Sequence, residues 1–346
     1  MDYVNAIPKA IRHANNIIAE NLVGYKCVRE ENVFPPIRML PGGFCFSFQL
    51  ECQGKPDKCL RMWWRDDVRA KNLNHILRVS EYFKNNDIKY VIPYEYFDHV
   101  LKLYDGTNAP GVIMDWLDGQ TMMSYVKRNY MNSSAIRKLA DDFYDMVQYH
   151  KENGMAHGDL SDENIIIKPS GEICLIDYDS YYVDSWGKEI PQSTSGIGPY
   201  QHPNRMKGKD PFLNLNMDNF SHQVIYLSLL AISKDPNLFT ARIEESKGEK
   251  EKGILFKDVD MESYEAFTSP SSLYNRILEI NDSEIQKRLS QLCDAFKSPL
   301  SEICSIVPEP IAIQSEMASF CGICGHKFDN QIDLFCPDCG TKRENL

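Results

Sequence analysis

Between residues 132 and 177 the hydrophobic positions change from a helical period to two short runs. Apolar side chains recur every three or four residues from Ile136 to Val147, behind Asn132, a typical N-cap residue. Asn153-Gly154 then supplies a helix stop signal. A β-branched run at 165–167 and a second apolar run at 173–176 follow, separated by the turn Pro169-Ser170-Gly171. The pattern therefore predicts a helix, a polar loop and a β-hairpin.

Polar side chains flank both ends of this predicted hairpin. Asp159 and Asn164 precede it and Asp177 follows it. Folding the hairpin brings its two ends together, and with them these three side chains. Phosphoryl transfer needs oxygen ligands for Mg²⁺ and a carboxylate near the attacking hydroxyl. The set therefore favours a phosphoryl-transfer site, although each residue alone is also common in loops and helix caps.

Other stretches predict elements on either side of this segment. Residues 38–50 alternate like a hairpin, and residues 58–63 read as a further strand. Asp218 opens an apolar helix that runs to about residue 231. Near the N-terminus, Ile11, Ala14 and residues 17–18 recur at helical spacing and predict a helix docked on the sheet.

The run His157-Gly158-Asp159-Leu160, with Asn164 and then Asp177-Tyr178-Asp179, resembles the catalytic core of the protein kinase superfamily. The family pattern is H-R-D-L-x-x-x-N followed by D-F-G. The resemblance implies that Asp159 is the catalytic base, that Asn164 and Asp177 hold Mg²⁺, and that His157 packs the loop. It also implies that Asp218 ties this loop down. The likeness covers roughly residues 34–301.

Upstream, the resemblance implies a nucleotide site. Val112-Ile113-Met114-Asp115-Trp116-Leu117 resembles the strand and hinge between two lobes, so that Asp115, Trp116 and Leu117 would meet an adenine ring. Arg61 stands in place of the lysine that holds the ATP phosphates; a strand-edge surface charge is the other interpretation. Its partner would be Glu81, which also reads as a solvated helix face. Gly42 and Gly43 would form the phosphate loop, or an ordinary turn.

The chain is also, more loosely, similar to an uncharacterised bacterial group of kinase-like proteins. The shared features are Arg61, the motif Ile176-Asp177-Tyr178-Asp179, and the motif from Gly196 to Pro203 that contains Tyr200-Gln201-His202. Within the core, Gly158 stands where protein kinases have arginine. Asp179 stands where they have glycine, which removes a flexible joint and adds a carboxylate near the metals.

Four of the eleven cysteines form two paired knuckles near the C-terminus: Cys321, Cys324, Cys336 and Cys339. Two residues between cysteines let one tight turn aim both sulfurs at one tetrahedral Zn²⁺, so a closed structural zinc site resembling a zinc ribbon is predicted. A segment this short needs the metal to fold. Disulfides or free thiols are the alternatives.

The predicted fold class is α+β: a bilobal protein-kinase-like fold with a small C-terminal zinc ribbon. The expected parts are an N-terminal helical segment (1–30), an N-lobe (31–114), a C-lobe (115–304), a proline-containing linker (305–316) and the zinc ribbon (317–346). A length of 346 residues is ample for such a core.

Charge and hydropathy narrow the expected surroundings. The net charge of −11 removes the simplest electrostatic reason to bind nucleic acid, so nucleic acid is an unlikely partner. No apolar run approaches the ~20 residues that span a bilayer, and the start of the chain lacks a secretory pattern. We therefore expect a cytoplasmic protein with no membrane association. Its partner would be a protein substrate or a protein that contacts the zinc ribbon.

The function expected from these residues is transfer of the terminal phosphate of Mg-ATP to a Ser/Thr hydroxyl of a protein. A pseudokinase scaffold is one alternative, favoured by Arg61 and the unusual phosphate loop. A small-molecule kinase is another, because H-G-D-L-x-x-x-N with I-D-x-D is also close to that class. The cofactors expected are ATP, Mg²⁺ and a structural Zn²⁺.

Overall fold

The computed structural model describes residues 3–187, 189–192, 196–209, 211–246 and 252–307, together with 323–324, 326–327 and 338. The chain divides into two units, Met1–Val307 and Pro308–Leu346. Of the four predicted zinc ligands, Cys321, Cys336 and Cys339 lie outside the described residues and Cys324 lies within them. The zinc ribbon therefore stays a prediction, and the described elements belong to the first unit.

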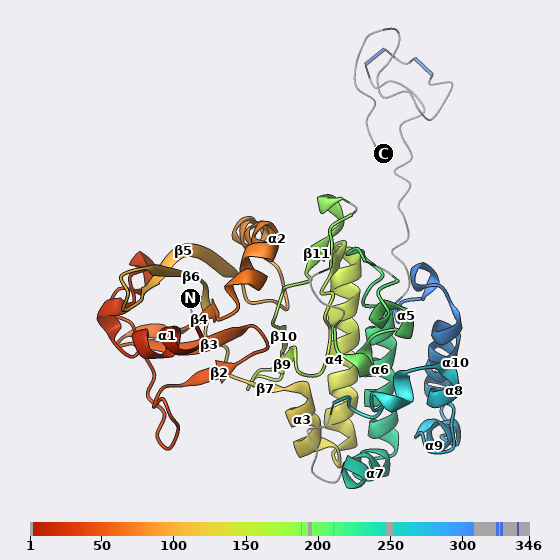
Figure 1. The fold of residues 1–346 in the computed structure, drawn as a ribbon. Helices are drawn as coiled ribbons and strands as arrows, with labels where there is room; N and C mark the ends of the chain where they lie inside the picture. Colours follow the sequence, from red (N-terminus) through yellow and green to blue (C-terminus); the bar gives the residue numbers. More distant parts are fainter. Residues whose placement is uncertain are drawn as a thin grey trace. The chain divides into compact units, whose positions relative to one another are not determined.

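The first part of this unit is an antiparallel sheet (Figure 1). Its order is β1-β3-β4-β6-β5, and β2 pairs with β3. The predicted hairpin and following strand are confirmed as β2, β3 and β4. The strands are β1 (Lys26–Cys27), β2 (Met39–Pro41), β3 (Cys45–Cys52), β4 (Lys55–Trp63), β5 (Tyr94–Lys102) and β6 (Asn108–Asp115).

The two faces of this sheet have different covers. The N-terminal segment, with α1 (Tyr3–Ala10), packs on one face against Phe48, Leu60 and Ile113. Helix α2 (Asp66–Asn85) packs near the other face, which carries Cys45, Trp63 and Val112. We call this second face the inner face. Arg61 lies on it, because Arg61 is the direct cross-strand partner of Ser47 and Val112.

The predicted helix through Ile11 and Ile17 is wrong. After α1 the chain forms only short 3₁₀ turns at Ala14–Asn16 and Glu20–Leu22. Ile17 instead makes a bridge to Leu101 of β5, and the amide of Ile18 donates to Val100 O at 2.9 Å. Strand β5 is the edge of the sheet, so its open backbone groups hold this segment extended while its apolar residues are still buried.

The second part of the unit is mainly helical (Figure 1). The predicted central helix is confirmed as α4, with the Asn132 side chain accepting from the amide of Ala135. The buried helix that begins after Asp218 is confirmed as α6. The helices are α3 (Met122–Asn129), α4 (Ser133–Glu152), α5 (Pro203–Met206), α6 (Asn219–Lys234), α7 (Asn237–Ser246), α8 (Tyr264–Phe267), α9 (Tyr274–Leu278) and α10 (Ser283–Lys297).

Short strands flank the loops that hold the polar residues. The predicted hairpin is confirmed as β9 (Ile165–Ile167) and β10 (Ile173–Leu175), and β7 (Gln120–Thr121) pairs with β9. β8 (Met155–Ala156) pairs with β11 (Tyr182–Val183), so the segments before Asp159 and after Asp179 run side by side. The architecture is a mixed helix and sheet fold of the α+β kind. No helix in the described chain is both long and apolar enough to cross a membrane.

Candidate active site

The loop that carries Asp159 is held by hydrogen bonds to a buried carboxylate, that of Asp218. Asp218 accepts hydrogen bonds from the amides of His157 (2.6 Å) and Gly158 (2.9 Å). Its side chain makes no capping bond to α6, although it occupies the N-cap position. The expectation that Asp218 ties the loop down is thus confirmed, because the carboxylate serves the loop and not the helix.

Gly158 is required by both conformation and space. Its φ is +79°, a left-handed value that glycine adopts without penalty. A Cβ there would lie 2.4 Å from Ser180 O and 2.8 Å from Met217 Cε. The arginine found at this point in the family therefore has no room in this chain.

Two side chains fix the two ends of the loop. His157 lies close to Ile176 O, with Nε2 at 2.9 Å, and its Nδ1 accepts from the amide of Asp159. This places the ring proton on Nε2. The Asn164 side chain donates through Nδ2 to Asp159 O at 2.7 Å. The backbone carbonyl of Asn164 accepts from the amide of Ile176. The structure thus brings Asp159 and Asn164 together beside the strand that leads into Asp177.

Asp159 is held in an environment that favours its protonated form. Its Oδ1 is buried and makes no hydrogen bond within the described chain. Burial, followed by the nearby charge of Asp177, raises the pKa of Asp159 from 3.8 to about 6. A carboxylate poised near neutrality with an open acceptor atom is suited to accepting a proton.

Asp177 and Asp179 lie on either side of a buried tyrosine. Asp177 has a φ of +67°, which is uncommon and costly for a residue with a Cβ. Between the two aspartates, Tyr178 is only 3 % exposed. Its hydroxyl donates to Leu175 O and accepts from the amide of Ile92 at 2.8 Å, and its ring meets that of Phe83 at 5.0 Å. This anchor holds the strained segment in place.

Arg61 joins the inner face of the sheet to this segment. Its Nη2 donates to Asp177 Oδ1 at 3.0 Å and to Asp179 Oδ2 at 3.2 Å. Its Nε donates to Cys45 Sγ at 2.9 Å, and its side chain is 13 % exposed. The interpretation of Arg61 as a strand-edge surface charge is therefore wrong.

Glu81 does not reach Arg61. Its side chain is exposed on α2 and accepts from Asn85 Nδ2 at 2.7 Å. The helix turns Ile76, Val79 and Phe83 inward at the positions that could approach the sheet. The predicted pair between Arg61 and Glu81 is therefore replaced by pairs with Asp177 and Asp179, and the solvated-face interpretation of Glu81 describes the structure.

Gly42 and Gly43 form the exposed turn between β2 and β3, with the amide of Gly42 donating to Cys45 O at 2.8 Å. Neither glycine has a positive φ, and a Cβ on Gly43 would meet nothing within 4 Å. The backbone alone therefore does not require glycine at Gly43. A role for the turn in contacting phosphate stays a prediction.

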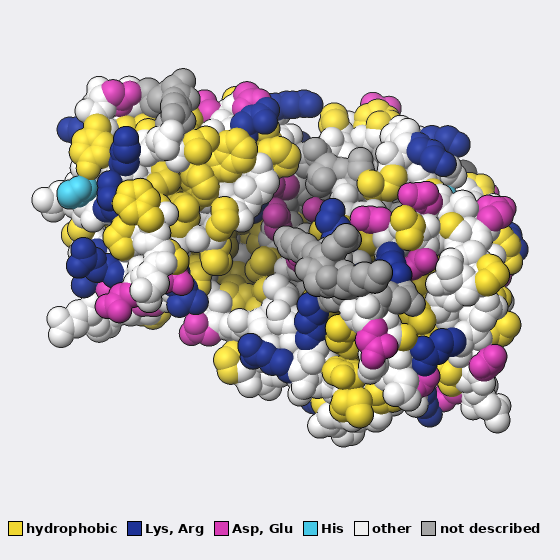
Figure 2. Space-filling model, turned by 60° about the horizontal axis from the view of Figure 1, so that its bottom comes forward, with side chains coloured by type: hydrophobic (Ala, Val, Ile, Leu, Met, Phe, Trp, Pro, Cys, Tyr) yellow, Lys and Arg dark blue, Asp and Glu magenta, His cyan; other side chains and the backbone are white. Residues whose placement is uncertain are grey.

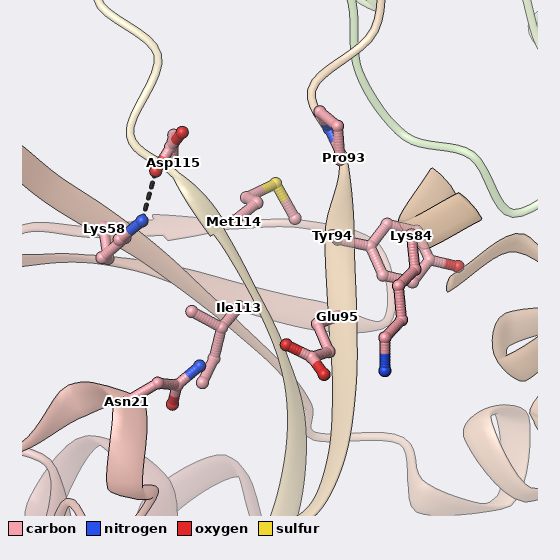
Figure 3. A pocket seen from close by; sticks show the side chains of 9 residues that line it. All are labelled: Asn21, Lys58, Lys84, Pro93, Tyr94, Glu95, Ile113, Met114 and Asp115. Carbon is pink, nitrogen blue, oxygen red and sulfur yellow. Dashed lines mark hydrogen bonds and ion pairs between the residues drawn. The ribbon is translucent and has the colours of Figure 1, made fainter. Parts of the chain in front are cut away.

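The predicted hinge follows β6. The Asp115 side chain forms an ion pair with Lys58, and the Trp116 amide donates to Asp57 O at 3.0 Å. That amide is already used, so the carbonyl of Trp116 and the backbone of Asp115 and Leu117 stay predicted to meet an adenine ring. A pocket of about 390 Å³ lies beside Asp115 (Figure 3). Its lining includes Asp115, Tyr94 and Glu95, but not Asp159, Asp177 or Asp179.

Arg205 belongs to the site although no sequence pattern singles it out. This side chain is 2 % exposed and donates to Gly158 O at 2.6 Å and Gln201 Oε1 at 2.6 Å. It also donates to Gln192 Oε1 at 3.1 Å and Met217 O at 3.2 Å. This buried cation thus holds the loop of Asp159 through the carbonyl of Gly158. A lone arginine after the Gly196–Pro203 motif gives no signal of burial in the sequence.

The donor set fits a magnesium ion. The two residues expected to hold it, Asn164 and Asp177, offer an amide and a carboxylate oxygen, the kind of ligand that Mg²⁺ prefers, and the loop of Asp159 brings them close together. Among the described residues no group of three or more His, Cys, Asp or Glu side chains is placed so that it could hold a metal ion, so a magnesium site here would depend on Asn164 as well. Figure 2 shows a hollow between the apolar surface of the sheet and the mixed surface of the helical part, with acidic side chains at its back.

Comparisons with known proteins agree with this geometry at a coarse level. The chain is 24 % identical over 167 residues to a probable serine/threonine-protein kinase HAL5-like of Eremothecium gossypii, covering 42 % of the chain. It is 28 % identical over 159 residues to the HAL5-like protein of Vanderwaltozyma polyspora, covering 40 % of the chain. It is 25 % identical over 168 residues to the NUAK family SNF1-like kinase 2 of Rattus norvegicus, covering 48 %.

The similarity is distant and partial. The matched regions are 24 %, 21 % and 25 % of the respective relatives. The chain therefore spans about a quarter of the length of these relatives. No protein-family model matches the chain. The relatives support phosphotransfer of the kinase kind, and leave nucleotide and substrate to be proposed from the site.

Proposed function

We propose that this chain is a kinase-fold phosphotransferase that moves the terminal phosphate of Mg-ATP to a Ser/Thr hydroxyl of a protein. The observation that carries the proposal is the loop of Asp159. Asp218 accepts hydrogen bonds from two backbone amides of that loop, and the Asn164 side chain donates a hydrogen bond of 2.7 Å to Asp159 O. Asp177 completes the group from the next strand in a strained backbone conformation. Such strain at a polar cluster supports a functional role.

Each residue then has a distinct role. Asp159 accepts the proton of the attacking hydroxyl, since its Oδ1 has no other partner in the described chain. Asn164 and Asp177 supply oxygen atoms to Mg²⁺, and Arg61 donates to phosphate oxygens. When bound, the magnesium ion neutralises charge on the transferred phosphate. His157, Asp218 and the other loop contacts hold Asp159 in position.

Two features support a protein acceptor over a small molecule. The relatives compared above are named as protein kinases. The segment from Pro199 to Pro203 also stands where protein kinases have their A-P-E segment, which favours that class over small-molecule kinases. This segment is built into the core: Tyr200 is fully buried, and its hydroxyl accepts from the amide of Ile254 at 3.0 Å. A small-molecule kinase stays the alternative that the acceptor assay separates.

A nucleotide-binding scaffold without turnover is favoured by one observation. One carboxylate oxygen of Asp177, the residue proposed for magnesium, accepts a hydrogen bond from Arg61 Nη2 at 3.0 Å. If this ion pair were permanent, Arg61 would compete with the metal for the Asp177 carboxylate and would weaken both metal binding and transfer. A catalytic Arg61 must instead release Asp177 when magnesium and nucleotide enter.

The test is transfer of labelled terminal phosphate from Mg-ATP by wild type and by Asp159→Asn. Acceptors are the protein itself, a generic protein and a metabolite extract. Asp141→Asn is the matched control, because Asp141 is exposed on α4 and its ion pair is with Arg137, one turn earlier on the same helix. Label in protein that requires Asp159 supports the proposal. Label confined to small molecules moves the assignment to a metabolite kinase, and no Asp159-dependent label favours the scaffold.

The predicted zinc ribbon is proposed to recruit a protein partner. It supplies few basic residues, so a protein surface is a better match than nucleic acid. Removing the chain after Pro310 should leave the intrinsic transfer rate unchanged if the ribbon only recruits. Loss of that rate would show that the ribbon contributes to the catalytic unit itself.

A further inference from the structure

Arg61 is a buried cation whose carboxylate partners set where it points. A guanidinium withdrawn from water needs a close negative partner, and loss of that partner is costly. On the inner face, Cys45 Sγ and the Trp63 ring, 5.9 Å from Arg61 Cζ, line its stem. Neither contact supplies a full charge. The partner must therefore come from an element that faces the sheet.

Helix α2 does not supply this charge. Its sequence contains three carboxylates, and each has another partner. Asp66 pairs with Arg69 at 2.7 Å and Asp67 pairs with Arg65 at 2.7 Å, both at the start of the helix. Glu81 is exposed and accepts from Asn85. Movement of α2 therefore breaks no ion pair of Arg61 in the described chain.

The segment after β10 supplies two carboxylates to the same nitrogen. Asp177 and Asp179 both accept from Arg61 Nη2. They can do so together because Tyr178, between them, is turned the other way into the core. No hydrogen bond from Arg61 Nη1 is made to the described residues, so this nitrogen is open to a ligand.

We propose that Asp179 is the positioning residue for Arg61, holding the guanidinium toward the nucleotide phosphates while Asp177 serves the metal. The inference rests on the proposed function, in which Asp177 is a magnesium ligand. A carboxylate that binds a divalent cation gives up most of its attraction for the arginine. Asp179 then remains as the charge that keeps Arg61 in place.

This arrangement changes which element positions the Arg61 guanidinium. Asp179, two residues after the proposed metal ligand Asp177, holds Arg61 in place, and helix α2 does not. Nucleotide affinity should accordingly depend on Asp179 and be insensitive to Glu81. Magnesium affinity should depend on Asp177, with Asp179 acting only through Arg61.

The test is a double-mutant cycle on the full chain with Asp179→Asn, Arg61→Met and the double variant. Binding of a fluorescent ATP analogue is measured at saturating and at limiting magnesium. Asp179→Asn should weaken binding by about tenfold or more in the wild-type background, because it removes one partner of a buried charge. In the Arg61→Met background the same change should have less than about a twofold effect. Glu81→Gln is the matched control and should change nothing.

A second readout does not need nucleotide. The urea midpoint of unfolding is measured for the same variants without added magnesium. Non-additive midpoints for Arg61 and Asp179 are expected, with additive midpoints for Arg61 and Glu81. Equal effects of Asp179→Asn in both backgrounds would overturn the proposal. If wild type binds no nucleotide, the proposed function fails, and the unfolding cycle alone decides: additive midpoints for Arg61 and Asp179 refute the pairing, and coupled midpoints support it.

Discussion

Replacement of Gly158 by alanine should disturb the loop of Asp159 through two separate costs. The first is conformational, since the φ of +79° costs an L-residue about 1–2 kcal/mol. The second is steric: the new Cβ would lie 2.4 Å from Ser180 O and 2.6 Å from Ser180 Cβ. A backbone oxygen cannot turn aside as a flexible side chain does. Either the loop or the segment after Asp179 must therefore move.

The size of the effect follows from these two terms. Overpacking of a filled site adds roughly 1–3 kcal/mol. The smaller freedom of alanine in the unfolded chain returns about 0.4–1 kcal/mol. Gly158→Ala should thus lower the free energy of unfolding by roughly 1–5 kcal/mol. Because the amide and carbonyl of Gly158 bond Asp218 and Arg205, a shift here should also lower the transfer rate by about 100-fold under folding conditions.

Gly171 provides the matched control. Its φ is +90°, and a Cβ there would meet nothing within 4 Å. Gly171→Ala pays the conformational cost alone, about 1 kcal/mol after the unfolded-state offset, and should leave phosphate transfer unchanged. Urea unfolding and the labelled-phosphate assay measure both quantities. If the two variants were equally destabilised, or if Gly158→Ala kept full activity, the packing of the loop against Ser180 would not constrain the site.

Three further predictions test separate parts of the molecule. The proposed role of Asp159 as base makes its ionised form the active one. We therefore expect kcat/KM to fall about tenfold per pH unit below about 6, the value to which burial raises the pKa of Asp159. A profile flat to pH 5 would exclude Asp159 as the base. Arg205→Met should lower the free energy of unfolding in urea titrations by at least about 2 kcal/mol, because the buried carbonyls of Gly158 and Met217 lose their donor. An unchanged free energy of unfolding would show that water replaces the lost donor. Elemental analysis should find one zinc per chain, lost when Cys336 and Cys339 are changed to serine; metal-free folded protein would refute the ribbon.

Local signals in the sequence predicted those elements that local chemistry determines. Helix α4 begins where Asn132 caps it and ends at Asn153, as the pattern indicates. The hairpin β9–β10 likewise follows from two short apolar runs and one turn. In both cases the deciding contacts are only a few residues apart, so the sequence alone contains them.

The errors and omissions come from contacts between distant residues. The segment around Ile17 has a helical period, but an open sheet edge at β5 offered it a better partner. The pairing of Arg61 with Asp179 joins residues 118 apart, and nothing near either one indicates it. Arg205 is buried because four acceptors from separate segments surround it. These contacts depend on which elements pack together in the folded chain, and a short stretch of sequence does not contain that information.

The anchoring of Tyr178 has a consequence for inhibitor chemistry. Compounds that gain space by turning the Asp177–Asp179 segment over would have to withdraw this ring from Phe83 and break its bonds to Leu175 O and the amide of Ile92. Each lost hydrogen bond costs about 0.5–1.5 kcal/mol, and the unpaired groups left behind add more. Selective ligands for this chain should therefore be sought among molecules that accept the segment as it stands and address the open nitrogen of Arg61.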